Sequence, residues 1–256
     1  MYNNMLKLVK IFWGILIFLI FWQGLVVFFK IPEFLLPSPI LVGDVLVNKY
    51  SILFQDAKIT GIEIILGMIF GSLLGIINGL LLQIFKNFRS VMLPMLVVSQ
   101  AIPIYAIAPI LVLWLGFDLA PKVVMSTIII FFPVTTAFYD GLRQTKKGYL
   151  DIAKTMGANN ITTLFKVRCR SALPALGSGL RVAAAFAPIG AIVGEWVGAS
   201  AGLGYRMLYS NARMQTDDMF GALVVLVVMS LFLYYFVDWL VRKTIHWNND
   251  DLRKKC

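Results

Sequence analysis

Six apolar runs in this chain of 256 residues are each long enough to cross a lipid bilayer. A membrane-spanning helix needs about 20 predominantly apolar residues, because each residue advances the helix by only about 1.5 Å. The runs lie approximately at Ile11–Phe29, Ile59–Phe85, Val91–Gly116, Val123–Tyr139, Leu176–Val197 and Phe220–Val241. They predict an all-α polytopic membrane protein with six transmembrane helices in a single transmembrane domain, residues 1–256.

The composition excludes an ordinary soluble domain. The chain is 59% hydrophobic and 14% charged, with a mean hydropathy of +0.83, whereas soluble domains are about 45–50% apolar. The first run has the length of a signal peptide, but no A-x-A-like cleavage site follows it. The next residues are Lys30-Ile31-Pro32-Glu33, so an uncleaved first helix is the simpler interpretation.

The basic residues predict how the spans are oriented. With the N-terminus in the cytosol, 17 of the 23 Lys and Arg residues fall on the cytosolic side, and the outer set includes Lys122. Cytoplasmic loops of membrane proteins carry such an excess of Lys and Arg. We therefore predict an N-in, C-in topology, and the net charge of +10 requires no nucleic-acid partner.

Few residues suit catalysis, disulfide formation or metal binding. Cys169 and Cys256 both fall in stretches predicted to be cytosolic, where structural disulfides are rare. The single histidine, His246, stands alone after the last span. The sequence also contains no Gly-x-x-x-x-Gly-Lys-Ser/Thr phosphate loop. We expect no catalytic residue, no metal site and no cofactor on this chain.

The second run carries a glycine at every fourth position: Gly67, Gly71, Gly75 and Gly79. This spacing places all four on one stripe of a helix. A stripe without side chains lets another backbone approach closely, as in small-xxx-small packing. The pattern predicts helix packing inside a bundle rather than a ligand site.

The segment Phe34–Gln55 is not a clean span. Its Pro37-Ser38-Pro39 sequence predicts a helix entry, with Ser38 as the N-cap and Pro39 as the first helical residue. Apolar residues follow at helical spacing. An amphipathic helix on the outer membrane surface and an ordinary loop helix are equally compatible with this pattern.

Two runs carry the residues that suit a translocation path. Prolines flank Gln100 in the third run. Each proline leaves one backbone carbonyl of its helix without a hydrogen-bond donor, and a bilayer tolerates such a carbonyl only where another group donates to it. Gln100 and Pro103 therefore favour an interpretation in which this run lines the translocation path. The alternative is that the three prolines of the run only bend a packing helix. In the fifth run Pro188 and Glu195 extend the candidate path, because an ionisable residue at depth marks a cavity or ion route.

The alternative for Glu195 is a position near the outer interface, where the carboxylate meets water. Glu63 lies nearer the end of its span, and we expect it at the membrane interface.

A polar, basic loop at about residues 143–174 separates the fourth and fifth spans. A helix from Tyr149 to Met156, with Asp151 in its first turn and Gly157 as a C-terminal cap, is predicted. Asn159 or Asn160 caps a second helix, and Pro174 ends the element before the fifth span. The second helix carries an apolar stripe of Ile161, Leu164 and Phe165. This stripe either docks a soluble partner or packs on the inner ends of the spans.

The loop resembles the EAA motif of binding-protein-dependent ABC transporter permeases. That motif is Glu-Ala-Ala, three residues, Gly, nine residues and Ile-x-Leu-Pro. Asp151-Ile152-Ala153 takes its first position, Gly157 has the motif's spacing and Val167 takes the Ile place. The sequence departs from the motif at Asp151, Ile152 and Cys169-Arg170, where Glu, Ala and Leu-Pro are expected. The Arg170 departure removes the motif's proline.

The resemblance extends over about residues 34–247. It is closest to permeases of the nitrate, sulfonate, taurine and pyrimidine importers, and it rests on Ser99–Pro103, Ala108–Gly116, Phe131–Val134, Asp140–Arg143, Ala187–Trp196, Gly202–Tyr205 and Asn211–Asp217. The last three stretches are similar to permeases for hydroxymethylpyrimidine, a thiamine precursor.

The resemblance implies a type I ABC importer permease in the bacterial cytoplasmic (inner) membrane. It implies a second permease copy as a homodimer, an extracytoplasmic substrate-binding protein, and an ABC ATPase that carries ATP and Mg²⁺. It also assigns the coupling contacts to Asp151, Ala153, Gly157, Ile161, Leu164 and Phe165.

Two other classes of protein remain as alternatives. A secondary transporter would use intramembrane charges and often inverted repeats, but no convincing repeat is found. A membrane enzyme would need a nucleophile or a metal cluster. Neither alternative accounts for the loop around Gly157.

Overall fold

The computed structural model describes residues 2–245 and residue 247, and this part of the chain is helical with no strand. The elements are α1 (Tyr2–Phe28), α2 (Pro39–Asn48), α3 (Tyr50–Ile84), α4 (Lys86–Ala101), α5 (Ile104–Leu115), α6 (Leu119–Arg143), α7 (Lys147–Thr155), α8 (Asn160–Thr162), the π-helical segment η1 (Thr163–Arg168), α9 (Cys169–Gly198), α10 (Leu203–Ala212) and α11 (Thr216–Thr244). The all-α prediction is confirmed. Cys169 is a free, half-buried thiol, whereas His246 and Cys256 lie outside the described residues.

Within the described residues, four helical stretches are long and apolar enough to cross a bilayer: α3, α6, α11 and the continuous stretch Asn160–Gly198. The bent pair α4–α5 makes a fifth if it is counted as one span. In α1 the apolar part among the described residues is the shorter helix Trp13–Phe28. A polytopic membrane fold is thus established by length and composition, while the count of six spans stays a prediction.

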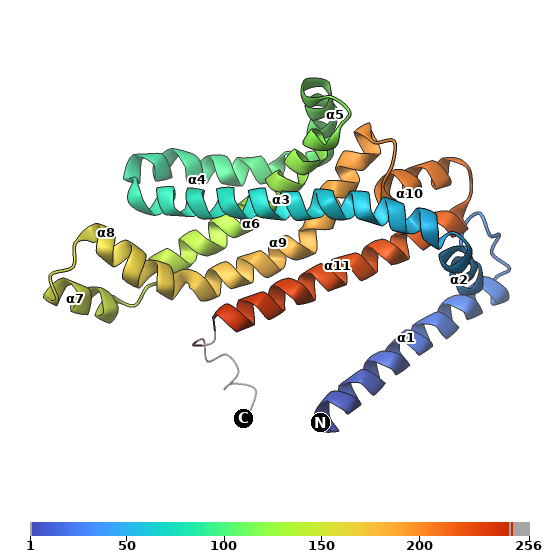
Figure 1. Cartoon of the computed structure of the whole chain (residues 1–256), viewed down its shortest axis with the longest axis horizontal. Coiled ribbons are helices and arrows are strands. Elements are labelled where there is room, and N and C mark those ends of the chain that lie inside the picture. The colour runs from blue at the N-terminus through green and yellow to red at the C-terminus, as the bar shows by residue number, and fades with distance from the viewer. Residues whose placement is uncertain (1, 246, 248–256) are drawn as a thin grey trace. The chain divides into compact units, whose positions relative to one another are not determined.

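The third apolar run is not one kinked helix. It breaks into α4 and α5, which meet at 99° (Figure 1). The break falls at Ile102-Pro103, where both residues are extended rather than helical. The cause is local, because a proline disfavours helical backbone in the residue before it. Pro94 and Pro109 lie inside α4 and α5 without breaking them.

The four glycines of α3 lie directly against α6 and form what we call the glycine seam. A Cβ placed at Gly67, Gly71, Gly75 or Gly79 would lie 2.3, 2.7, 2.8 or 2.9 Å from a side chain of α6. The facing side chains are those of Ser126, Ile130, Val134 and Phe138, which repeat with the same four-residue period. Only a residue without a side chain lets the two helices approach this closely.

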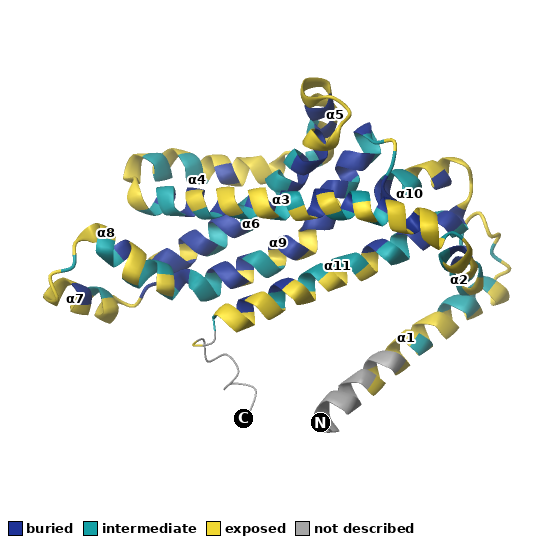
Figure 2. Cartoon of the chain, in the orientation of Figure 1, coloured by how far each residue is buried: buried dark blue, intermediate teal, exposed yellow. Residues whose placement is uncertain are grey.

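The chain divides into two compact units. The larger one contains Thr60–Ser200 and Val227–Cys256, and its core lies between α6 and α9, where buried positions concentrate along both helices (Figure 2). Alanines of α9 dominate this contact, and Ala183, Ala187 and Ala191 are fully buried. Small residues again permit close packing of helices inside the bilayer.

The smaller unit contains Met1–Ile59 and Ala201–Leu226. Helix α2 begins as predicted, because Ser38 caps it by accepting a hydrogen bond from the Leu41 N–H at 3.3 Å and Pro39 is its first residue. Its buried residues are Val42 and Val45. Thr216, at the start of α11, donates a hydrogen bond to the carbonyl of Glu33 at 2.5 Å.

Candidate functional site

Helix α7 ends in a tight glycine cap. The Gly157 N–H donates to the carbonyl of Lys154 and the Ala158 N–H to that of Ala153, both at 2.9 Å. These two bonds and the φ of +74° at Gly157 form a Schellman motif. The helix begins at Lys147 rather than Tyr149, so Asp151 lies in its second turn. The prediction that placed Asp151 in the first turn is wrong.

The second helix of the loop does not stop before the fifth span. Asn159 caps it by accepting a hydrogen bond from the Thr162 N–H at 2.7 Å, and the chain then stays helical from Asn160 to Gly198. Pro174 lies inside α9, so the prediction that it ends the element is wrong. A proline removes one N–H donor, and membrane helices tolerate this loss where other groups satisfy the freed carbonyl.

The two helices of the loop enclose a groove, which we call the loop groove, with a volume of about 710 Å³. Its wall includes Tyr149 and Ile152 of α7 and Met156, the residue that caps α7 at its C-terminal end and is 81% exposed. Lys166 and Arg170 add two positive charges to the lining. The loop groove therefore presents apolar surface beside basic side chains.

The predicted coupling residues divide between two environments. Ala153 and Leu164 are buried, and Leu164 belongs to the core of the larger unit. Asp151, Gly157, Ile161 and Phe165 are exposed. The apolar stripe of the second helix thus both packs on its own bundle and leaves two large side chains uncovered.

A second cavity, the bend cavity, lies where α4 breaks into α5. Its volume is about 450 Å³. It is lined by Ser99, Gln100, Ile102, Pro103, Ile104, Ile107, Ile128, Ile129, Phe132, Pro133, Val182 and Phe186. The structure thus brings together two of the predicted path residues, Gln100 and Pro103. The other two, Pro188 and Glu195, are buried in α9 and do not line this cavity.

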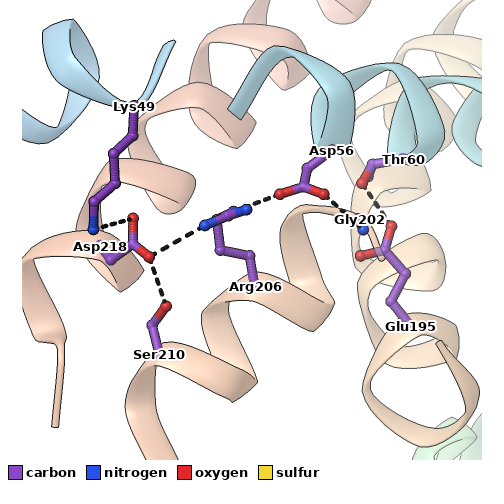
Figure 3. Close-up of polar contacts among 8 residues, drawn as sticks. All are labelled: Lys49, Asp56, Thr60, Glu195, Gly202, Arg206, Ser210 and Asp218. Carbon is purple, nitrogen blue, oxygen red and sulfur yellow. Dashed lines mark hydrogen bonds and ion pairs between the residues drawn. The ribbon is translucent and has the colours of Figure 1, made fainter. Parts of the chain in front are cut away.

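Glu195 is 1% exposed, so the alternative in which it meets water near the outer interface is wrong. Its carboxylate accepts a hydrogen bond from the Thr60 hydroxyl at 2.6 Å (Figure 3). A charge at depth needs such partners, because burial without them costs several kcal/mol. The bond joins α9 to α3 within the larger unit.

Glu63 is fully buried, and Lys122 lies beside it as a buried residue of α6 rather than in a loop. Their Oε1 and Nζ atoms are 3.6 Å apart. Gly194 of α9 makes room for the lysine, because a Cβ there would lie 2.8 Å from the Lys122 Cα. The sequence held one signal for this pair: two opposite charges, each within about one helical turn of the first residue of an apolar run.

In the smaller unit, Arg206 of α10 forms an ion pair with Asp56 of α3 and another with Asp218 of α11, the latter at 3.2 Å (Figure 3). Asp218 also accepts a hydrogen bond from Ser210 at 3.1 Å and lies 3.5 Å from the Lys49 Nζ. The Gly202 N–H donates to Asp56. This network, which sequence patterns did not reveal, ties three helices together.

Among the described residues no group of three or more His, Cys, Asp or Glu side chains is arranged to hold a metal ion. The long apolar helices, the helical loop with its groove and the cavity at the broken helix define a polytopic membrane protein with an internal cavity and an exposed helical loop.

The chain belongs to the family of binding-protein-dependent transport system inner membrane components, whose model matches residues 67–245. A Haemophilus influenzae protein named "Probable ABC transporter permease protein" is 50% identical over 229 residues, covering 90% of this chain and 94% of the relative. The protein is therefore an ABC transporter permease subunit, a multi-pass component of the inner membrane.

Two further relatives have names that include a substrate. The formylaminopyrimidine transport permease protein ThiX of Halalkalibacterium halodurans is 38% identical over 199 residues, covering 77% of this chain and 78% of the relative. The riboflavin transport system permease protein RibX of Chloroflexus aurantiacus is 32% identical over 235 residues, covering 91% and 88%.

A solved structure of the MetNI methionine ABC transporter in an inward-facing conformation shares the fold. Its TM-score is 0.64, with 22% identity, and the match covers 75% of this chain and 95% of that one. The prediction of a type I ABC importer permease fold is confirmed.

Proposed function

We propose that this permease is the pathway-forming subunit of an ATP-driven importer for a thiamine pyrimidine precursor of the hydroxymethylpyrimidine type. The observation that carries the importer assignment is the loop groove, in a chain of the binding-protein-dependent permease family. The substrate rests on the similarity of Ala187–Trp196, Gly202–Tyr205 and Asn211–Asp217 to pyrimidine permeases. The names of the ThiX and RibX relatives, which both include a heteroaromatic compound, agree with it.

The ATPase would be a separate subunit docked in the loop groove, and it would bind the ATP and Mg²⁺. Exposed Tyr149, Ile152 and Met156 offer apolar area, which drives association when it leaves water. Lys166 and Arg170 favour a partner with acidic residues at the rim of its contact surface. This division of labour fits a sequence without a phosphate loop.

The continuous helix from Asn160 to Gly198 supports a direct mechanical link. One of its ends forms the loop groove, and farther along Val182 and Phe186 line the bend cavity. A displacement of the loop by closing ATPases would thus move a wall of that cavity. Alternating access requires contacts between the ATPases and the permease that differ between the inward-open and outward-open states.

A second copy of the permease and an extracytoplasmic binding protein complete the proposal. Val182, Phe186 and Ile189 are exposed along one face of α9, and this apolar face suits a second copy across a shared pathway. A homodimer would place two bend cavities on the two sides of that pathway. The binding protein would deliver substrate from the outer side.

Uptake of labelled hydroxymethylpyrimidine, in cells with and without this chain, tests the substrate. Unlabelled taurine, nitrate and thiamine serve as competitors. We expect uptake to depend on the chain and to resist all three competitors. Unchanged uptake in cells lacking the chain would overturn the substrate assignment.

The alternative within the family is import of a sulfonate, taurine or nitrate. It would be favoured if labelled taurine or nitrate, rather than the pyrimidine, required the chain for uptake. Membership of the ABC permease family sets aside the alternative of a secondary transporter.

A further inference from the structure

We propose that the bend cavity is a binding site within the permease for an uncharged, planar heteroaromatic ring. The inference rests on the proposed function, because it assigns a site and a ligand class to the importer's own pathway. It does not require that the ligand be hydroxymethylpyrimidine itself.

The size of the bend cavity suits one small ring compound. Ligand pockets in proteins commonly measure about 300–1,000 Å³, and this cavity measures about 450 Å³. It exists because Ile102 and Pro103 leave the helix and turn α5 away from α4. The walls come from α4, α5, α6 and α9, so the ligand would contact both halves of the broken span and two neighbouring spans.

The charge of the lining argues against an anionic ligand. None of the residues that line the bend cavity in the described chain is ionisable. Arg181, which precedes the lining residue Val182, is ion-paired with Asp238 at 2.6 Å. A sulfonate or nitrate would therefore find no cationic partner in this lining to offset the hydration that it gives up.

The lining offers ring faces instead. Phe132 of α6 and Phe186 of α9 both border the cavity. Aromatic side chains pack favourably against flat ring systems in offset or edge-to-face arrangements. Two isoleucines from α5 and two from α6 also line the cavity.

The polar group that selects among flat rings would be Gln100. Its amide offers both a donor and an acceptor, which matches the adjacent amino group and ring nitrogen of an aminopyrimidine. No hydrogen bond of this side chain occurs within the described residues, whereas its neighbour Ser99 already donates to the Leu96 carbonyl at 2.7 Å. Gln100 is therefore the side chain free to bind a ligand edge.

The test is ligand-observed saturation-transfer NMR on the purified full-length permease in nanodiscs, with hydroxymethylpyrimidine as the probe. We expect a transfer signal that Gln100→Leu and Phe186→Leu each weaken by roughly 2- to 10-fold, the effect of one hydrogen bond or ring contact. Gln55→Leu and Phe70→Leu are matched controls on α3 that do not line the cavity. Excess methanesulfonate, taurine or nitrate should not displace the probe.

Three outcomes would overturn the proposal. The first is that neither hydroxymethylpyrimidine nor cytosine nor another neutral heteroaromatic binds to the permease. The second is equal binding by Gln100→Leu and wild type, and the third is displacement of the probe by the anions. Uptake of hydroxymethylpyrimidine in cells, without binding to the permease, would overturn the cavity site and leave the proposed function standing. Binding of cytosine that depends on Gln100, without cellular uptake of hydroxymethylpyrimidine, would support the site and overturn the proposed substrate.

Discussion

The glycine seam and the loop groove are opposite kinds of surface within one bundle. Along the seam, α3 and α6 leave no space for even one added methyl group. One helical turn from Gly67, the contact ends in the buried pair Glu63–Lys122. In the loop groove, by contrast, Ile152 and Met156 remain 58% and 81% exposed. The seam is complete within this chain, whereas the loop groove leaves large apolar side chains uncovered, as the proposed ATPase contact requires.

This difference predicts separate consequences for mutations. Changes in the seam should reduce the amount of folded permease. Changes in the loop should leave a folded permease that transports poorly.

The largest expected effect comes from Lys122→Met. Removal of the ammonium leaves the buried Glu63 carboxylate without its counter-ion, and breaking a buried pair in this way costs about 3–5 kcal/mol. Membrane abundance and detergent-solubilised melting temperature should both fall sharply. The double variant Glu63→Gln/Lys122→Met should recover most of the loss. Equal loss in the single and double variants would contradict a charge-pairing role.

Gly67→Ala comes next. Its Cβ would lie 2.3 Å from that of Ser126, and overpacking of this kind costs about 1–3 kcal/mol. A fall of roughly 2–10 °C in Tm is expected for a chain of this size. Gly148→Ala in α7 is the matched control, because nothing lies within 4 Å of its added Cβ. A Tm for Gly67→Ala like that of the control would show that the seam can relax.

Gly157→Val should act on coupling rather than folding. A left-handed residue with φ of +74° is costly for a β-branched side chain, by about 1–2 kcal/mol, although space at this position is open. Transport should fall roughly 5- to 30-fold, with normal membrane abundance. Gly157→Asn should retain most activity, since asparagine tolerates this conformation. Wild-type transport by the valine variant would rule out the glycine cap as part of the coupling element.

The smallest effects are expected in the loop groove itself. Met156→Ser and Ile152→Ser each remove apolar contact from the proposed ATPase interface, worth about 1 kcal/mol or roughly fivefold in affinity. Copurification of the ATPase with tagged permease would measure this loss at unchanged permease yield. Lys154→Ala, an exposed change on α7 outside the groove, is the control. Full ATPase retention by a variant that carries both Ile152→Ser and Met156→Ser would place the docking surface elsewhere.

Much of the fold could be predicted because its signals are local. The Ser38-Pro39 entry of α2 and the caps at Gly157 and Asn159 depend on bonds that reach only a few residues along the chain. The glycine spacing on α3 likewise indicates which face must be approached closely. The prolines of the third run indicated no more than a bend, and the 99° break at Ile102-Pro103 could not be predicted because the angle depends on how α4 and α5 pack.

The candidate sites divide in the same way. The loop was visible as a polar, basic stretch with motif spacing around Gly157. The bend cavity was only partly visible, through Gln100 and Pro103, because its walls on α6 and α9 come from distant parts of the chain.

The sequence by itself determined a membrane-embedded helical permease, the approximate positions of its apolar helices and the location of its polar, basic loop. These follow from hydrophobic length and from backbone chemistry within a few residues. Only the tertiary structure decided that Lys122 lies beside Glu63 and that Glu195 is buried and hydrogen-bonded to Thr60. It also decided that the second helix of the loop continues through Pro174 into α9. Burial and charge pairing depend on which helices become neighbours, and a residue's own sequence surroundings do not contain that information.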